Sequence, residues 1–303
     1  MNASSPPGHL SPSRAVFIDR VTCVSGVLVG AYLVATVAPM AMYARATSHP
    51  LPFVAHLLAL IGTVAVLRAR WAWTRPVRAW LPLIVGPFLY VELRWLIEGF
   101  GITHADARVR EWESALFVGN PSATWAAAMP IRWMSEVLHV AYASYYLIVY
   151  LPPAVLYLRH RQTEFAATMV ALTIVYGLCF FTYLFFPVDG PRYLLGPAAA
   201  PEGPMRAFVL RLLDEGSSRG TAFPSSHVAA SVVASLAALH FQRRVGIAAS
   251  LMTVGLTLAT VYGGFHYAVD ALAGSIVGAT AWVLARALCR ALSAMGEQSA
   301  SAA

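Results

Sequence analysis

Long apolar runs follow one another along almost the whole chain, and short polar segments separate them. A helix needs about 20 apolar residues to cross the roughly 30 Å of hydrocarbon in a bilayer. Eight runs approach or exceed that length, and they predict an all-α, polytopic transmembrane helix bundle. The predicted spans are residues 21–43, 50–67, 79–98, 133–158, 165–187, 224–241, 246–264 and 267–289.

The segments outside these runs suggest how the chain is organised. Residues 1–16 are rich in Ser and Pro, and we expect them, like the tail 294–303, to be disordered. We expect residues 17–293 to form a single transmembrane domain. The polar segment 99–130 should form an amphipathic helix at the membrane surface. Its acidic residues include Asp106, Glu111 and Glu113.

The composition agrees with a membrane protein. Of the 303 residues, 58% are hydrophobic and only 12% are charged, whereas about a quarter of a soluble domain is charged. This balance excludes a disordered chain and a secreted disulfide scaffold, and it argues against a soluble enzyme. The three cysteines, Cys23, Cys179 and Cys289, lie far apart in apolar runs. We interpret them as small hydrophobic side chains.

The distribution of charge predicts the orientation of the bundle. The net charge is +7, but the basic residues do not cluster among aromatics, so no nucleic-acid partner is expected. With a cytoplasmic N-terminus, the inner segments hold twelve arginines and the outer segments seven. The positive-inside rule therefore favours both termini in the cytoplasm.

Three stretches interrupt the apolar pattern with reactive side chains, and each falls at a predicted membrane boundary. Residues 187–193 end the fifth span, residues 220–227 open the sixth, and residues 262–270 join the seventh to the eighth. An odd number of crossings precedes the first stretch, and one helical hairpin lies between the second and the third. All three stretches therefore reach the outer face, where they predict one shared site.

The first two stretches carry groups that suit a phosphate. The planar guanidinium of Arg192 can make a bidentate contact with phosphate, although an interfacial arginine that contacts lipid head groups is an equal alternative. Pro224 suits the first turn of a helix. The N–H groups of Ser225, Ser226 and His227 would then point out of a helix N-terminus, which is an anion site.

The third stretch carries a histidine–carboxylate pair. His266 and Asp270 are four residues apart, so on a helix they share a face. The carboxylate could accept one imidazole N–H and leave the other nitrogen as a nucleophile, while His227 protonates a leaving oxygen. A structural His–Asp pair is the alternative. The three residues could also bind zinc, but their phosphate-binding neighbours favour phosphoryl transfer.

The order of these motifs resembles the three-part signature of the type 2 phosphatidic acid phosphatase superfamily. The resemblance covers about residues 130–290 and implies a six-helix core, a phosphohistidine intermediate, and no metal or other cofactor. It also implies a role for each residue. His266 would be the nucleophile, Asp270 its orienting partner and His227 the general acid, and Arg192, Ser225 and Ser226 would hold the phosphate.

Two departures from the phosphatase pattern are similar to the inositolphosphotransferase branch, which includes inositol phosphorylceramide synthases. The first motif lacks a lysine, and Thr260 stands where the third motif usually has arginine. The stretches 116–121 and 135–142 are also similar to that branch. Arg219, five residues before Pro224, could substitute for the missing arginine.

Further polar side chains are candidates for a substrate pocket. For His139, a hydrogen-bonded core histidine is as good an explanation as a residue that contacts the substrate. Glu92, Arg94 and Glu98 lie inside the third span, where a buried ion network is a better explanation than a head-group pocket. The pocket candidates are Tyr193, Tyr262, Glu136 and His139.

Together these features predict an integral membrane enzyme that acts on a lipid phosphate or a phospholipid head group. We expect it in a bacterial plasma membrane, with its active site on the outer, periplasmic face. The acceptor is water or a polyol such as inositol. One alternative is a lipid phosphate phosphatase that releases inorganic phosphate. The other is a non-catalytic membrane protein or transporter that retains the fold.

Overall fold

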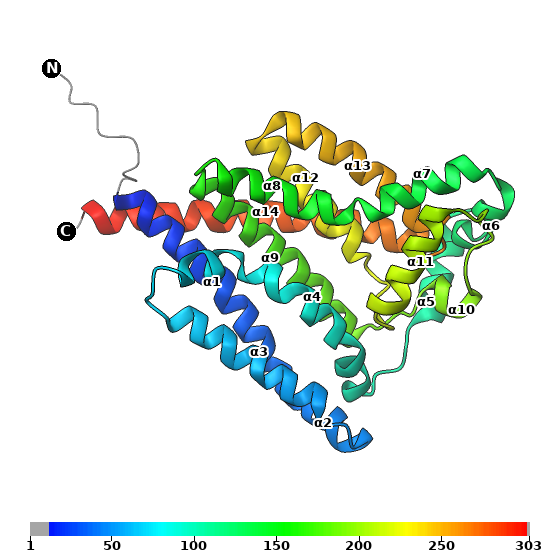
Figure 1. The fold of residues 1–303 in the computed structure, drawn as a ribbon, viewed down its shortest axis with the longest axis horizontal. Coiled ribbons are helices and arrows are strands. Elements are labelled where there is room, and N and C mark those ends of the chain that lie inside the picture. The colour runs from blue at the N-terminus through cyan, green and yellow to red at the C-terminus, as the bar shows by residue number, and fades with distance from the viewer. Residues whose placement is uncertain (1–11, 302–303) are drawn as a thin grey trace.

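The computed structural model describes residues 12–301, and within them the side chains of residues 16–295. The described chain is almost entirely helical (Figure 1). Its first half consists of α1 (Pro12–Ala35), α2 (Val37–Thr47), α3 (Leu51–Arg68), α4 (Thr74–Phe100), α5 (Asp106–Leu116), α6 (Pro121–Ala128), α7 (Arg132–Ala143) and α8 (Tyr145–Leu158). The second half consists of α9 (Gln162–Phe185), α10 (Pro191–Leu195), α11 (Pro204–Gly216), α12 (Ser226–Phe241), α13 (Arg243–Tyr262) and α14 (Ala268–Ser301).

Seven segments of the described chain are long and apolar enough to cross a membrane. This confirms the polytopic helical architecture that the apolar runs predict. The sixth predicted span, 224–241, corresponds to α12, which is apolar but shorter than the other candidates. The seven segments are Val16–Thr47, Leu51–Arg68, Thr74–Phe100, Arg132–Leu158, Gln162–Phe185, Arg243–Tyr262 and Ala268–Met295.

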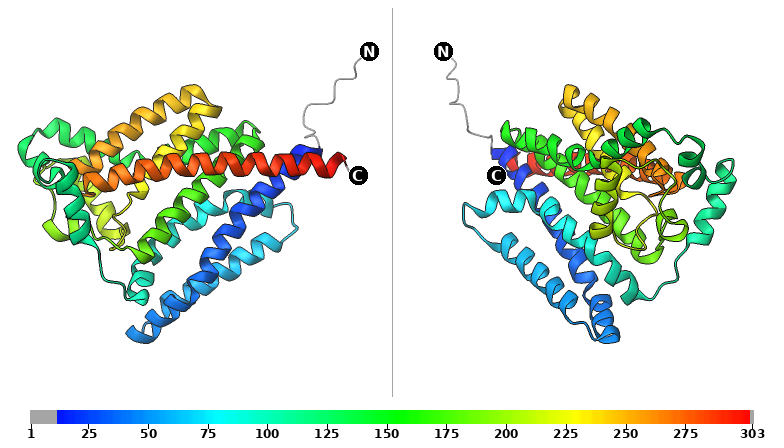
Figure 2. Two further views of the ribbon diagram at one scale, coloured as in Figure 1. Left: turned by 180° about the vertical axis from the view of Figure 1, so that it is seen from behind. Right: turned by 45° about the vertical axis from the view of Figure 1, so that its right-hand side comes forward.

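The helices form two groups that meet along α9. On one side α9 packs against α1 and α4, and on the other side it packs against α12 and α14. Figure 2 shows α1, α2 and α3 as a separate arm beside the bundle that contains α12, α13 and α14. The side chains of α9 are buried along most of its length, because it has neighbours on both sides.

The start of α1 and the end of α14 lie at the same end of the molecule (Figure 1). The seven candidate segments together with α12 would make the even number of crossings that this arrangement needs. The number of crossings and the cytoplasmic location of that end stay predictions. The two helices also reach into the segments for which we expect disorder, because α1 begins at Pro12 and α14 runs to Ser301. Residues 1–11 and 302–303 lie outside the described residues.

Short helices gather at the end opposite the termini, where Figure 1 shows α5, α6, α10 and α11 around the start of α14. The polar segment 99–130 forms α5 and α6 there. The segment is helical as predicted, but it does not expose all of its acids to water. Asp106 is only 8% exposed and Glu113 only 1%.

Small residues allow α12 to lie close to α14. A Cβ atom added to Gly274 would come within 2.5 Å of the Ser225 carbonyl oxygen, and one added to Gly278 would come equally close to the carbonyl oxygen of Ala229. Any larger residue at these positions of α14 would therefore displace the start of α12. This close contact brings the second and third motifs together.

Candidate active site

Backbone hydrogen bonds join the three motifs. Val188 forms a single parallel bridge with Thr221, so the first motif lies beside the second. The Ser225 N–H donates to the Asp270 carbonyl oxygen over 3.0 Å, which ties the second motif to the third. The prediction that the three stretches lie close together is therefore correct.

His266 lies in the turn between α13 and α14, and its ring has a defined orientation. Its Nδ1 atom is 2.9 Å from the carbonyl oxygen of Ala222. Because a carbonyl oxygen only accepts hydrogen bonds, Nδ1 carries the proton and Nε2 keeps a free lone pair. Burial lowers the pKa of the His266 imidazole to about 4, since desolvation disfavours the charged ring. The ring is therefore neutral at pH 7.

Asp270 lies beside His266 but does not accept its proton. Its Oδ2 atom is 3.6 Å from Nδ1 of His266, which is too long for a hydrogen bond. The same oxygen accepts the Tyr267 N–H over 2.8 Å. The expectation that Asp270 orients the ring is therefore wrong, because the Ala222 carbonyl takes that role. His266 precedes the first residue of α14, so the two side chains do not share a helical face.

His227 lies opposite His266, on the second residue of α12. The two ring centroids are 6.2 Å apart. Aromatic side chains surround His227: the Tyr142 ring stacks on it at 5.3 Å, and the Tyr145 ring lies 4.4 Å away. The Tyr142 hydroxyl is 3.4 Å from Nε2 of His227. A group between the two histidines could contact both rings.

The N–H groups at the start of α12 have more partners within the protein than predicted. Ser225 is the N-cap, and its hydroxyl accepts the Val228 N–H. Pro224 precedes this cap and is not in the first helical turn. Of the three N–H groups proposed to bind an anion, that of Ser225 donates to Asp270 and that of Ser226 donates to the Tyr183 hydroxyl. Two of the three donors therefore already have protein partners.

Arg192 lies on α10, where its guanidinium is held from two sides. Nη1 donates to the Ser217 hydroxyl over 2.8 Å, and Nη2 pairs with the carboxylate of Asp214. The Arg192 side chain is 13% exposed. Tyr193 also hydrogen-bonds to Ser217, over 2.6 Å. Ser217 and His227 line the same cavity, so Arg192 lies one residue away from the cavity that contains His227.

Arg219 lies in a different place. Its side chain is 62% exposed, and its Nη2 atom is 3.2 Å from Oδ2 of Asp189. Arg219 and Tyr193 line a polar cleft of about 780 Å³. Neither His227 nor His266 lines this cleft. Thr260, at the position of the missing arginine, is fully buried. The structure therefore does not bring Arg219 to the histidine pair.

The chain was compared with protein families, curated proteins and solved structures. The model of the PAP2 superfamily matches residues 107–284. The chain belongs to the PAP2 superfamily. Neither the comparison with curated proteins nor that with solved structures found a match. The resemblance seen in the motifs is thus confirmed for the superfamily, and the inositolphosphotransferase branch stays a prediction.

The matched region of this PAP2 superfamily member includes every predicted site residue. It begins in α5 and ends in α14, so the arm formed by α1, α2 and α3 lies outside it. Superfamily membership suggests activity on lipid phosphates. The arm belongs to the part of the chain that the family model does not describe.

Three of the predicted pocket residues hold secondary structure together instead. Tyr262 is fully buried, and its hydroxyl donates to the Met129 carbonyl oxygen. Glu136 accepts two backbone N–H groups at the start of α11, over 2.9 and 3.1 Å. His139 is 2% exposed, and its Nδ1 atom is 2.6 Å from the Ser135 carbonyl oxygen. His139 is therefore a hydrogen-bonded core histidine.

The charged residues of α4 have separate partners. Glu92 is fully buried and pairs with Nδ1 of His56 on α3 over 3.0 Å. Arg94 donates to the Ser217 carbonyl oxygen over 3.2 Å. Glu92 and Arg94 therefore contact other segments and not each other, and Arg94 and Glu98 both line the polar cleft beside Arg219. The His56–Glu92 pair lies in the region outside the PAP2 match.

Sequence reasoning missed two buried carboxylates on α5. Asp106 accepts the N–H groups of Asp189 and Gly190, each over 3.0 Å, just before Arg192. Glu113 accepts the N–H groups of Ala268 and Val269, over 3.1 and 2.8 Å, just after His266. The two acids are seven residues apart, about two helical turns, so they share one face of α5. That spacing was the only signal in the sequence.

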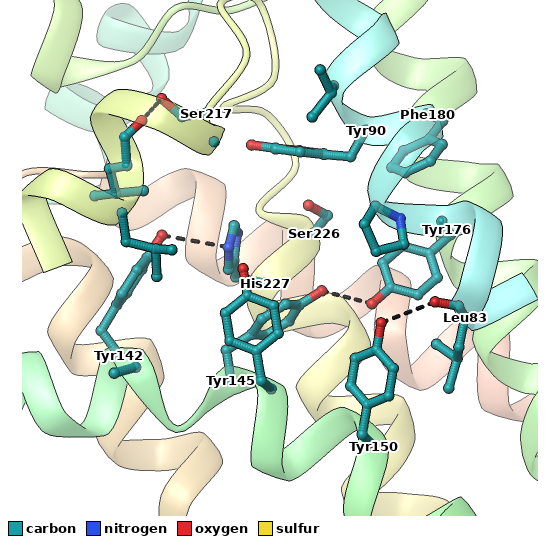
Figure 3. Close-up of a pocket in the computed structure, with 18 residues that line it drawn as sticks. Leu83, Tyr90, Tyr142, Tyr145, Tyr150, Tyr176, Phe180, Ser217, Ser226 and His227 are labelled. Atoms are coloured by element: carbon teal, nitrogen blue, oxygen red, sulfur yellow. Dashed lines mark hydrogen bonds between the residues drawn. The ribbon is translucent and has the colours of Figure 1, made fainter. Parts of the chain in front are cut away.

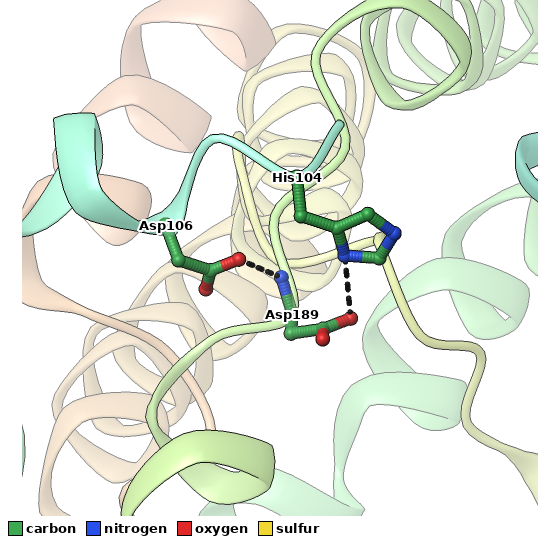
Figure 4. A group of neighbouring side chains, drawn as sticks. All are labelled: His104, Asp106 and Asp189. Atoms are coloured by element: carbon green, nitrogen blue, oxygen red, sulfur yellow. Dashed lines mark hydrogen bonds and ion pairs between the residues drawn. The ribbon is translucent and has the colours of Figure 1, made fainter. Parts of the chain in front are cut away.

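Asp106 also belongs to a small polar cluster with His104 and Asp189 (Figure 4). Among the described side chains, these three are close enough to share a cation, although the sequence showed no acidic cluster. Their oxygens already have partners within the protein. Asp189 pairs with His104 over 3.0 Å and with Arg219, and its Oδ1 atom accepts the Gly220 N–H. We interpret the cluster as structural.

His227 lines a cavity of about 230 Å³ that we call the tyrosine cavity (Figure 3). Its walls come from α4, α7, α8, α9, α11 and the start of α12. His227, Ser226 and Ser217 contribute the polar part of the lining. The tyrosines that line it are Tyr90, Tyr142, Tyr145, Tyr146, Tyr150 and Tyr176.

Proposed function

We propose that this PAP2 superfamily member is an integral membrane phosphatase or phosphotransferase that acts on a lipid phosphate through a phosphohistidine. The observation that carries the proposal is the histidine pair. His266 has a neutral ring with Nε2 free, and His227 lies 6.2 Å away between centroids. These are the two groups that the chemistry requires, a nucleophile and a proton donor.

In the first step, Nε2 of His266 attacks the phosphorus atom of the bound lipid. A bond forms between nitrogen and phosphorus, and the bond between phosphorus and the leaving oxygen breaks. His227 in its protonated form gives its proton to that oxygen, which leaves as an alcohol. The phosphate itself favours protonated His227, because a nearby negative charge stabilises imidazolium.

In the second step, an acceptor attacks the phosphohistidine. Neutral His227 takes a proton from the acceptor hydroxyl, the acceptor oxygen bonds to phosphorus, and the bond to Nε2 breaks. Water as acceptor gives hydrolysis, and an alcohol gives a new phosphate ester. His266 returns to its neutral form, so the cycle closes with no net change in the protein.

Arg192 supplies positive charge in this proposal. Its guanidinium is held by Asp214 and Ser217, and Ser217 lines the tyrosine cavity. A bound phosphate could replace Asp214 as the partner of Arg192, since both present anionic oxygens to the same fork. Ser226 also lines the cavity and could donate its hydroxyl to the phosphate. No metal is needed in this scheme.

The choice between hydrolysis and transfer depends on the acceptor. The departures that are similar to the inositolphosphotransferase branch favour transfer of a phosphorylated head group to a polyol such as inositol. Release of inorganic phosphate is the second candidate, favoured by the superfamily in general. In either case we place the reaction at the outer, periplasmic face of a bacterial plasma membrane, because the positive-inside rule puts the termini on the opposite side.

The test uses the full chain purified in detergent. The protein is given lipids labelled in the phosphate, with and without myo-inositol, and both free phosphate and new lipid species are measured. We expect His266→Ala to abolish turnover. His49→Ala, at an exposed position far along the chain from the motifs, is the matched control and should leave turnover unchanged.

The products decide between the candidates. Phosphate release that does not depend on inositol indicates a lipid phosphatase, and an inositol-containing lipid absent from the variant indicates a transferase. Full activity in His266→Ala would contradict the phosphohistidine proposal. Failure to turn over any phosphorylated lipid would favour a non-catalytic role.

A further inference from the structure

The tyrosine cavity is more apolar than its residue types suggest, because the tyrosine hydroxyls are used within the protein. The hydroxyl groups of five of the six tyrosines form hydrogen bonds within the protein. A ligand would therefore contact mainly the faces of their rings. The bonds are Tyr142 with His227, Tyr145 with Tyr176, Tyr150 with the Leu83 carbonyl and Tyr90 with Thr221. Such a wall suits hydrocarbon better than a polyol, whose hydroxyls need free partners.

One residue of the cavity wall, on α8, is also exposed on the outside of the bundle. Tyr146, the sixth tyrosine, is 51% exposed and lies in the candidate span Arg132–Leu158. An exposed face of a membrane-spanning helix contacts lipid, so the cavity has a wall that borders the bilayer interior. A hydrocarbon chain could enter there without passing through water.

The polar and apolar parts of the cavity lining come from different elements. Tyr146 and Tyr150 come from α8 and Tyr176 from α9, whereas His227 and Ser226 lie at the start of α12. The rings of Tyr142 and Tyr145 lie against His227. A molecule with an apolar part and a phosphate could therefore place each part against a surface of matching polarity.

The position of His227 indicates which part of the substrate lies in the cavity. In the proposed reaction, His227 protonates the leaving oxygen, and that oxygen carries the lipid portion of a lipid phosphate. His227 lines the cavity, whereas His266 does not. The hydrocarbon attached to the leaving oxygen therefore lies on the His227 side, where the tyrosine rings are.

We propose that the tyrosine cavity binds the hydrocarbon of the leaving lipid alcohol and so selects substrates by chain length. This proposal rests on the proposed function and adds a specificity site to it. The residues that form the wall, and not the histidines, then determine how strongly a long chain is preferred over a short one.

Gly86 on α4 offers a direct test. It lines the tyrosine cavity and also the neighbouring cavity against α1, and a Cβ atom added there meets no other atom within 4 Å. Gly86→Leu should therefore add a side chain at the wall of both cavities without disturbing the helices around it. Gly177 on α9 is the matched control, because it is equally open but lines only the neighbouring cavity, so Gly177→Leu reports the effect of filling that cavity alone.

The measurement is kcat/KM for dioleoyl and for dibutanoyl phosphatidic acid, for the wild type and for both variants. If leucine excludes about two methylene groups from the cavity, Gly86→Leu lowers kcat/KM for the dioleoyl lipid roughly tenfold. We expect the dibutanoyl value to change much less and Gly177→Leu to preserve the ratio. An unchanged ratio in Gly86→Leu would overturn the proposal.

A binding measurement keeps this test separate from the proposed function. Phosphatidic acid with a diazirine in its acyl chain is photo-crosslinked to the His266→Ala protein, and the labelled peptides are identified. Labelling of Tyr150 or Tyr176 that Gly86→Leu removes supports the cavity, even if no turnover is found. Labelling confined to the outer surfaces of the bundle would refute it.

Discussion

The carboxylate of Glu113 allows a sharp test of how the site is built. Glu113 on α5 is 1% exposed and accepts the first two N–H groups of α14, over 3.1 and 2.8 Å. These donors have no partner within the helix. A residue from a distant segment therefore caps the helix that follows His266. We expect Glu113→Gln to destabilise the protein and to displace His266.

The expected loss follows from the two hydrogen bonds. Glutamine keeps one acceptor oxygen but turns an NH₂ group toward the second N–H, which is left buried without a partner. A hydrogen bond to a charged group contributes about 1.5–3 kcal/mol, and a negative charge at a helix N-terminus adds about 0.3–1 kcal/mol. Glu113→Gln should therefore cost about 2–4 kcal/mol of unfolding free energy.

The assay is thermal unfolding of the purified protein in detergent, together with the initial rate on a lipid phosphate. The control is Glu111→Gln on the same helix, where the side chain is 72% exposed and pairs weakly with Arg108 over 3.7 Å. Surface changes of this kind stay within about 0.5 kcal/mol. If Glu113→Gln unfolds at the same temperature as Glu111→Gln, the capping argument is wrong.

Three further predictions concern other parts of the molecule. Because the pKa of His266 is lowered to about 4, the rate should stay level through pH 6.5 and fall only as the pH approaches 4, which a pH–rate profile checks. The unfolding free energy should decrease earlier, between about pH 6.5 and 4, because the unfolded chain takes up the proton first; unfolding at several pH values checks this. Arg192→Ala should lower kcat/KM at least about tenfold, whereas the exposed Arg219→Ala should have little effect in the same assay. His56→Ala leaves the fully buried Glu92 without its partner, so thermal unfolding should show a loss of about 3–5 kcal/mol, and an unchanged melting temperature would contradict this.

The spans could be predicted because apolar length is a local property of the sequence. The run 165–187 corresponds to α9, and the run 50–67 corresponds to α3, which begins and ends one residue later. Helix ends were harder to predict. Pro224 looked like the first turn of α12, yet Ser225 became the cap, because the Ser225 hydroxyl is the group that can accept the Val228 N–H.

Of the candidate site, only the reactive side chains could be predicted from the sequence. His227 and His266 stand in recognisable motifs, and the fold brings them together. The partners that orient them come from elsewhere: the Ala222 backbone for His266, and the rings of Tyr142 and Tyr145 for His227. A backbone carbonyl has no sequence signature, and tyrosines inside an apolar run look like ordinary core residues.

The hydrogen bond from His266 to the Ala222 carbonyl also affects how the candidate site can change over generations. Every amino acid carries the same carbonyl group, so no single codon change deletes the acceptor that fixes the tautomer. Selection on residue identity at position 222 acts only through the space available to the side chain. The proton arrangement of the His266 ring is therefore inherited with the path of the backbone.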